Sequence, residues 1–337
     1  MIDHGGNLDV ARARFGGALE DWIDLSTGIN RRPYPVPELP SRHWNALPSR
    51  AEIEALHEAA RQAYRTTAPV LATAGAQAAI QLLPRLAPAG TAKIFAPTYG
   101  EFGHVLRATG WAVDSVSNLD ALGGADLAIV VNPNNPDGRQ HDPQQLLALT
   151  ARVGRLVVDE SFADPAPGLS MAPQAGGAGL LVLRSFGKFY GLAGIRLGFV
   201  LGCEADIAVL ASMVGPWPVS GVAIEIGRCA LLDDGWANET RARLVLDAAR
   251  LDELANHAGW ELIGGTPLFR LYEAGDGAGA QERLARAQIW SRVFKDRPSW
   301  LRLGLPGNET EWQRLGAVLS DQRISVSARN EQVDPSS

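Results

Sequence analysis

The sequence predicts an α/β protein with a three-layer, mostly parallel sheet in a large domain and a smaller α+β domain. Continuous apolar runs alternate with helical or turn stretches between residues 70 and 160, and two further runs follow. Runs of this kind are typical of parallel strands that are buried on both faces. After Pro216 the pattern changes to one long helix and several short strands, which indicates a second domain.

We divide the chain accordingly. Residues 1–45 are predicted to be an irregular amino-terminal segment, rich in Gly and Pro, that contributes to the active site and the small domain. Residues 46–215 form the large cofactor-binding domain in this interpretation, and residues 216–324 form the small domain. The polar stretch 325–337 is expected to be a disordered tail.

The first long helix is predicted over residues 50–64. Ser49 followed by Glu52 has the spacing of a capping box, which marks a helix start. Four residues then recur at helical spacing and share one apolar face, namely Ile53, Leu56, Ala60 and Tyr64.

Apolar runs predict the remaining elements. The large domain is expected to hold strands at 92–97, 126–131, 155–160, 180–186 and 197–202. In the small domain we expect helices at 235–257, 280–288 and 309–320, and strands at 260–264, 267–272, 289–294 and 300–305.

Composition excludes several classes of protein. The net charge of the 337 residues is −6 and no Lys/Arg run stands out, so nucleic-acid binding is not expected. The start of the chain does not resemble a secretory signal, and no apolar run is long enough to span a bilayer. We therefore expect a cytoplasmic protein with no membrane partner. The two cysteines, Cys203 and Cys229, are predicted to be buried thiols without a disulfide.

The most informative segment runs from Ser185 to Arg196 and contains Lys188. This lysine directly follows an apolar run, so we expect it at the carboxyl end of a strand, where α/β proteins bind ligands. An amine in such a pocket can have a lowered pKa and form a Schiff base, and Ser185 and Arg196 could hold a dianionic phosphate. A surface lysine in a Gly-rich loop would be the simpler interpretation if the segment stood alone.

Four other motifs occur in a consistent order. Asp159 closes a predicted strand, and a buried carboxylate there needs a cationic partner such as a protonated pyridine nitrogen. The segment 73–77 precedes a helical run and could direct backbone N–H groups at an anion. Residues 97–99 could place the Tyr99 ring over a flat cofactor, and the Asn/Pro/Gly run 132–138 follows another strand.

This set of motifs resembles the fold-type-I pyridoxal-phosphate (PLP) enzymes of the histidinol-phosphate aminotransferase-like group, over about residues 3–320. The resemblance implies that Lys188 carries PLP as a Schiff base and moves protons, that Asp159 pairs with the pyridine nitrogen, and that Tyr99 stacks on the ring. These three are the expected catalytic residues. Asn135 would bond the cofactor 3-oxygen, and the cofactor phosphate would be held by Gly75, Ala76, Ser185 and Arg196, with Gln77 as a helper.

The substrate residues also follow from resemblance. Arg302 matches the arginine that grips the substrate carboxylate, for which its planar fork is suited. The start His4-Gly5-Gly6-Asn7, the loop Ser26–Asn30, and Phe162 in place of a tyrosine that bonds the cofactor 3-oxygen all resemble the L-threonine-O-3-phosphate decarboxylases of cobalamin biosynthesis. That likeness implies that the residues near the substrate phosphate are His4, Gly5, Gly6 and Asn30. Arg292 would be a second substrate arginine, on carboxylate or phosphate.

One departure concerns the subunit interface of the expected homodimer. Family members present Tyr-Pro before the first long helix, and that tyrosine reaches the cofactor phosphate of the neighbouring subunit. The chain has Leu47-Pro48 there, so the resemblance does not extend to this contact, and Tyr34 or Trp44 could substitute.

This resemblance therefore implies PLP-dependent decarboxylation of L-threonine O-3-phosphate to (R)-1-amino-2-propanol O-2-phosphate, with a small phosphorylated amino acid as the ligand. An aminotransferase for histidinol phosphate or a related amino acid would use the same cofactor residues. A PLP-binding regulatory protein without turnover is a third interpretation, although no DNA-binding domain is visible. No metal site is expected.

Overall fold

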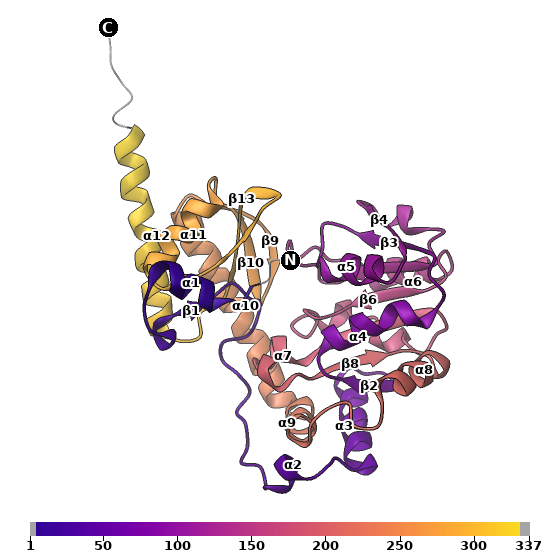
Figure 1. Ribbon diagram of the computed structural model, residues 1–337. Helices are drawn as coiled ribbons and strands as arrows, with labels where there is room; N and C mark the ends of the chain where they lie inside the picture. The colour runs from indigo at the N-terminus through magenta and orange to yellow at the C-terminus, as the bar shows by residue number, and fades with distance from the viewer. Residues whose placement is uncertain (1–4, 331–337) are drawn as a thin grey trace. The chain divides into compact units, whose positions relative to one another are not determined.

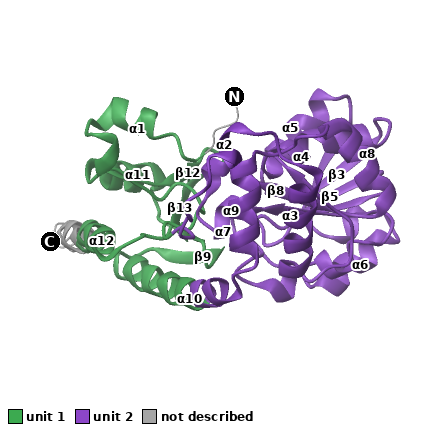
Figure 2. Ribbon diagram, turned by 90° about the horizontal axis from the view of Figure 1, so that it is seen from below, with its two compact units in different colours: residues 1–32, 242–337 green, residues 33–241 purple. Residues whose placement is uncertain are grey.

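The computed structural model describes residues 5–330, and the side chains of this range up to residue 320. The chain forms two compact units (Figure 2). Unit 2 comprises residues 33–241, and unit 1 combines residues 1–32 with residues 242–337. These limits differ from the sequence-based division at 45/46 and 215/216, because residues 216–241 pack with the large sheet's unit.

A seven-stranded sheet forms the centre of unit 2 (Figure 1). Its strands, in spatial order, are β2 (Val70–Thr73), β8 (Gly198–Leu201), β7 (Leu180–Ser185), β6 (Leu156–Asp159), β5 (Leu127–Val131), β3 (Thr91–Phe95) and β4 (Ala112–Val116). The predicted mostly parallel sheet is confirmed. β8 nevertheless runs antiparallel to both of its neighbours, so the expectation that 197–202 continues the parallel set is wrong.

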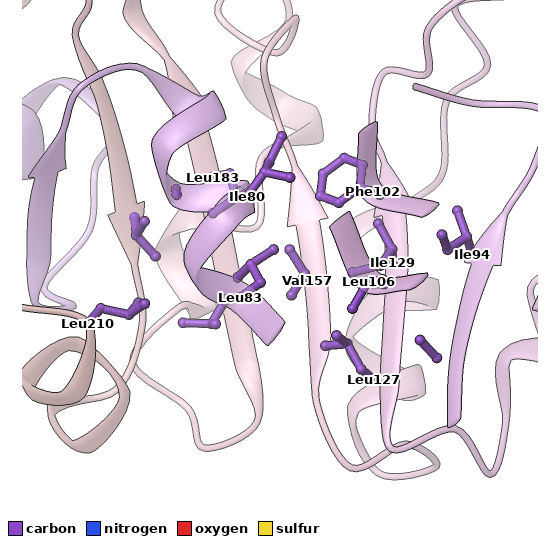
Figure 3. Close-up of a cluster of buried hydrophobic side chains, with 14 of the residues drawn as sticks. Ile80, Leu83, Ile94, Phe102, Leu106, Leu127, Ile129, Val157, Leu183 and Leu210 are labelled. Atoms are coloured by element: carbon purple, nitrogen blue, oxygen red, sulfur yellow. The ribbon is translucent and has the colours of Figure 1, made fainter. Parts of the chain in front are cut away.

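Helices on one face bury the main apolar core. α4 (Ala76–Leu82), α5 (Glu101–Ala108) and α8 (Glu204–Val214) all contribute to one cluster of buried side chains. Figure 3 shows Ile80, Phe102 and Leu106 lying beside strand residues such as Ile129 and Val157. The opposite face of the sheet is covered by α3 (Arg50–Ala63), which packs on β2 and on α9 (Gly221–Leu231). The three-layer arrangement therefore follows from strands that are apolar on both faces.

The strand directions bring six strand ends to one edge. β3, β4, β5, β6 and β7 are mutually parallel. β2 points the same way, because β2 and β7 are both antiparallel to β8, which lies between them. Segments that follow these strands therefore leave the sheet at the same edge, where open α/β sheets bind ligands.

Unit 1 is built on a four-stranded antiparallel sheet in the order β12 (Arg292–Phe294), β13 (Arg297–Gly304), β10 (Phe269–Glu273) and β9 (Glu261–Thr266). The run 289–294 was predicted as one strand, but it divides. β11 (Ile289–Trp290) pairs in parallel with β1 (Ile23–Asp24), whereas β12 joins the larger sheet.

The helices of unit 1 are α1 (Leu8–Phe15), α11 (Gly277–Arg286) and α12 (Glu309–Asn330), together with most of α10 (Asp234–His257). α1 lies in the segment that was predicted to be irregular. α12 continues to Asn330, so it includes six residues of the predicted tail, and residues 331–337 lie outside the described range. The shorter helices of unit 2 are α2 (Arg42–Asn45), α6 (Pro143–Thr150) and α7 (Phe186–Phe189).

Two local predictions can be compared directly with the structure. The capping box at the start of α3 is confirmed, since the Ser49 hydroxyl accepts from the Glu52 N–H and the Glu52 carboxylate accepts from the Ser49 N–H. The cysteines are free thiols, but Cys203 and Cys229 are only partly buried, which corrects the expectation of full burial.

The capping box generates a stability prediction. Ser49→Ala removes the acceptor for the Glu52 N–H, and we expect the free energy of unfolding to fall by about 1 kcal/mol in urea titrations. Ser212→Ala is the matched control, because this serine lies exposed within α8 and its hydroxyl bonds only a carbonyl of its own helix. Equal stability of the two variants would contradict a role for the cap.

Candidate active site

The expected phosphate-binding residues form a close backbone cradle at the sheet edge. Gly75 has a φ of +78°, and a Cβ at this position would lie 2.8 Å from Nη2 of Arg196. A Cβ on Gly198 would lie 2.5 Å from the Ala76 nitrogen, so no side chain larger than hydrogen fits there. Ser185 pairs with Gly198 across β7 and β8. The structure thus brings together the backbone of Gly75 and Ala76, the guanidinium of Arg196 and the end of β7.

Asp159 ends β6 and is buried. Its Oδ1 accepts hydrogen bonds from the Ser161 hydroxyl at 2.5 Å and from the Ser161 N–H at 2.9 Å. Burial raises the pKa of Asp159, while the Ser161 bonds and the charge of Lys188 act in the opposite direction. A cation placed against this carboxyl group would lower its pKa again, which is the environment that a protonated ring nitrogen provides.

Lys188 lies in α7, directly after β7, as expected. Its Nζ lies 5.8 Å from the centre of the Phe162 ring, and its charge acts on Asp159. Phe162 is buried. The expected amine, the carboxylate and the phenylalanine that replaces a tyrosine are therefore neighbours.

The Gln77 side chain bonds two neighbouring residues of the site. Gln77 Nε2 donates to Glu101 at 3.0 Å, and Gln77 Oε1 accepts from the Tyr99 hydroxyl at 3.2 Å. The side chain therefore links Tyr99 to Glu101, and the predicted help of Gln77 at the cofactor phosphate stays a prediction. Burial raises the pKa of Tyr99 to about 12, to which the charges of Glu101 and Asp159 add. Tyr99 is thus a protonated hydrogen-bond donor at neutral pH.

Asn135 lies in the loop after β5, and its neighbour Asn134 holds that loop against the loop after β3. Asn134 Nδ2 donates to the Pro97 carbonyl at 2.8 Å, and its Oδ1 accepts from the Thr98 hydroxyl at 2.6 Å. Asn134 is fully buried. This contact fixes the loop of Asn135 relative to the loop of Tyr99, and the motif 132–138 did not reveal that function.

In unit 1 the two expected substrate arginines are direct neighbours. Arg292 and Arg302 are paired residues on the antiparallel strands β12 and β13, so both side chains leave the same face of the sheet. Arg302 is buried, lies 5.0 Å from the centre of the Phe269 ring, and donates from Nη2 to the Ser26 carbonyl at 2.8 Å. Burial and the charge of Arg292 lower the pKa of Arg302 to about 10, so it stays charged at neutral pH.

The amino-terminal glycines lie against the loop that follows β1. The Gly6 N–H donates to the Ser26 hydroxyl at 2.7 Å, and a Cβ on Gly5 would overlap the Ser26 carbonyl oxygen. His4 lies outside the described residues. The two segments that resemble the decarboxylases, residues 5–7 and residues 26–30, are therefore in contact with each other.

Asn30 has a partner that sequence reasoning missed. Its Oδ1 accepts from the Arg32 N–H and from Nη2 of Arg243, both at 3.1 Å. Because both bonds end on the oxygen, the amide is oriented with its Nδ2 as a donor. Arg243 lies within α10, 213 residues along the chain, and nothing in the helical pattern of that segment distinguishes it from its surface arginines.

The possible substitutes for the missing interface tyrosine differ in their exposure. Tyr34 is buried, and its ring packs edge-on against Trp236 at 5.3 Å within unit 2. Trp44 is 70% exposed and Leu47 is 69% exposed. Of the two candidates, only Trp44 is accessible to another molecule.

The residues of unit 2 fit pyridoxal phosphate. The cradle of Gly75, Ala76 and Arg196 suits a phosphate, and the buried Asp159 suits a ring cation. Lys188 supplies an amine beside that carboxylate. Within the described part of the chain, no cluster of His, Cys, Asp or Glu could hold a metal ion, and no helix is long and apolar enough to cross a membrane.

The family model for aminotransferase class I and II matches residues 21–319. The chain belongs to this family. It is 48% identical to the threonine-phosphate decarboxylase of a Sinorhizobium species, over 96% of this chain and 99% of that protein. It is 42% identical to the threonine-phosphate decarboxylase of Pseudomonas aeruginosa, over 95% and 97% of the two chains.

Aminotransferases of the family are also similar, at lower identity. The histidinol-phosphate aminotransferase of Serratia proteamaculans is 29% identical over 94% of this chain and 88% of that protein. The structure of histidinol-phosphate aminotransferase from Sinorhizobium meliloti in complex with pyridoxal-5'-phosphate aligns with a TM-score of 0.80 at 18% identity, over 96% of each chain. This confirms the aminotransferase fold.

The cradle generates a prediction for cofactor binding. Gly75→Ala would place a methyl group against Arg196 at a φ that side chains rarely adopt, so we expect the dissociation constant for PLP to rise at least about tenfold. Gly168→Ala is the control, because a Cβ there meets nothing within 4 Å at an ordinary φ. Fluorescence titration of the apoprotein measures both. Unchanged PLP affinity in Gly75→Ala would argue against the cradle.

The tyrosines generate a pH prediction. All five tyrosines, Tyr34, Tyr64, Tyr99, Tyr190 and Tyr272, have a pKa raised by burial, Tyr99 to about 12. A raised pKa stabilises the fold at pH below the ordinary value near 10, and this contribution is lost as the pH rises through the folded value. We expect no tyrosinate absorbance at 295 nm near pH 10 in the native protein, and an immediate rise when urea unfolds it at that pH. A native titration midpoint near 10 would contradict the burial of these hydroxyls.

Proposed function

We propose that the protein decarboxylates L-threonine O-3-phosphate to (R)-1-amino-2-propanol O-2-phosphate, with PLP as cofactor, and serves cobalamin biosynthesis. The observation that carries this proposal is the 48% identity, over nearly the full length of both chains, to a protein named threonine-phosphate decarboxylase. The neighbouring arginines Arg292 and Arg302 support it, because the substrate carries two anionic groups.

The cofactor residues have distinct tasks in this proposal. When bound, PLP supplies an electron sink for the electron pair that remains on Cα as carbon dioxide leaves. Asp159 holds the ring nitrogen protonated, and its buried carboxylate is best stabilised when that cation is present. Lys188 would hold the cofactor through its amine, and its Nζ would hold the proton that is returned to Cα. Tyr99, fixed by Gln77, and Asn135 orient the ring, while Gly75, Ala76, Ser185 and Arg196 bind its phosphate.

The substrate residues select the bond that breaks. Arg302 grips the carboxylate in a bidentate pair, and Arg292 adds positive charge beside it. The backbone of Gly5 and Gly6, His4 and the Nδ2 donor of Asn30 bind the substrate phosphate. With both anionic ends held, the substrate can present only one orientation of its Cα bonds, and orientation is a large part of such catalysis.

Phe162 favours decarboxylation over transamination in this proposal. A phenylalanine cannot donate the hydrogen bond that a tyrosine would give to the cofactor 3-oxygen. The aminotransferase alternative shares the fold and all other cofactor residues, and its named relatives are less similar to this chain.

We further propose that the enzyme is a cytoplasmic homodimer. The family resemblance supports a dimer, and the exposed Trp44 and Leu47 supply apolar side chains where relatives place an interface residue.

Product analysis tests the proposed function. Purified protein loaded with PLP and incubated with L-threonine O-3-phosphate should release one carbon dioxide for each aminopropanol phosphate formed. Turnover should neither need nor consume 2-oxoglutarate, because decarboxylation returns the cofactor to its starting form. Lys188→Ala is the control and should release no carbon dioxide.

Two results would overturn this assignment. Turnover that requires 2-oxoglutarate and yields glutamate would establish the aminotransferase instead. A protein that binds PLP and L-threonine O-3-phosphate but forms no product would favour the regulatory interpretation.

A further inference from the structure

Ser26, in unit 1, contacts both the amino-terminal glycines and Arg302. Its side chain is buried, with 1% of its surface exposed. The hydroxyl accepts from the Gly6 N–H at 2.7 Å and donates to Asp24 Oδ1 at 2.6 Å. The hydroxyl therefore uses both its donor and an acceptor site.

The backbone of Ser26 is held as firmly as its side chain. Its N–H donates to the same Asp24 oxygen at 2.9 Å, and its carbonyl accepts from Nη2 of Arg302 at 2.8 Å. The Gly5 backbone lies so close to this carbonyl that a Cβ would overlap it. Leu25 and Gly304 pair beside it through a backbone bond of 2.7 Å, which ties the loop to the end of β13.

The chemistry of these contacts explains why a hydroxyl is needed. A backbone N–H needs a hydrogen-bond acceptor, whereas a carboxylate can only accept and needs a donor. A hydroxyl placed between them can accept from the N–H and donate to the carboxylate. Ser26 is such a group between Gly6 and Asp24. The negative charge of Asp24 also acts on Arg302. The same carboxylate therefore interacts with the Ser26 hydroxyl and with the Arg302 guanidinium.

We propose that Ser26 is a positioning residue that docks the amino-terminal segment at a fixed place relative to Arg302. Through its hydroxyl it sets the position of the Gly5-Gly6 backbone, and through its carbonyl it sets the guanidinium. The separation of these two groups would then select substrates by the distance between their phosphate and carboxylate. This inference rests on the proposed function for the identity of the two anions.

Substitution of Ser26 should affect the two ends of the substrate differently. Ser26→Ala keeps the carbonyl that binds Arg302 but removes the bond to Gly6, so only the phosphate end should lose affinity. Loss of one such hydrogen bond corresponds to roughly tenfold weaker binding. Ser26→Cys keeps the size of the side chain but is a weak donor and acceptor, and should show the same selective loss.

Calorimetry on PLP-loaded protein measures each end separately. Inorganic phosphate is the probe for the amino-terminal end, and unphosphorylated L-threonine is the probe for the Arg302 end. We expect phosphate to bind roughly tenfold more weakly to Ser26→Ala and Ser26→Cys, with L-threonine unaffected. In turnover assays the KM for L-threonine O-3-phosphate should rise by a similar factor while kcat is maintained.

Ser291→Ala is the matched control. Ser291 is equally buried in unit 1, but its hydroxyl has no hydrogen-bond partner within the described part of the chain. The variant should bind both probes as the wild type does. Equal loss of phosphate and L-threonine affinity in Ser26→Ala, or no loss of either, would overturn the positioning role.

The two proposals can fail separately. Absence of carbon dioxide release by the wild type would count against the proposed function, whereas the phosphate affinities of wild type and Ser26→Ala decide the role of Ser26 without turnover. Wild-type decarboxylation together with an unchanged phosphate affinity in Ser26→Ala would remove only this inference.

Discussion

The antiparallel direction of β8 is the constraint on which the proposed cofactor site at the sheet edge depends. β7 carries the chain to the edge of the sheet, α7 presents Lys188 there, and β8 starts back from the same edge. The start of β8 lies so close to the beginning of α4 that only glycine fits at position 198. Because of this contact, Arg196 and Gly75 share one location although 121 residues separate them.

Charge is placed on both faces of the strand ends. Asp159 and Glu160 are consecutive, and Glu160 accepts a hydrogen bond from Arg184 at 2.6 Å in a fully buried group that also includes Asp164. Burying charges is costly unless each has a partner, and removing one partner leaves the other uncompensated. The ends of β6 and β7 are thus joined by an ion pair in addition to their backbone ladder. This fixes the strand ends that carry Asp159 and Ser185.

The sequence predicted the features that depend on local composition. β5, β6 and β7 were predicted because buried parallel strands are continuously apolar, and α3 because its cap and its spacing agree. The direction of β8 could not be read, since a strand buried on both faces has the same pattern in either direction. β4 was missed because it is a mostly exposed edge strand without an apolar run. Gln77 and Arg243 could not be placed because their partners are distant in sequence and known only from the fold. The resemblance supplied the proposed site roles, and the structure supplied their contacts.

The register of β12 against β13 has a thermodynamic consequence. It places two guanidinium groups opposite each other on one face, and one of them, Arg302, is buried enough that its pKa falls to about 10. Like charges at such a pair of positions destabilise a sheet. An anion that binds between them removes part of that cost, so ligand binding and the stability of unit 1 are linked. The free energy of local unfolding of unit 1 should therefore be higher with a bound anionic ligand than without one. The difference between the two values reports how much of the repulsion between the guanidinium groups the ligand neutralises.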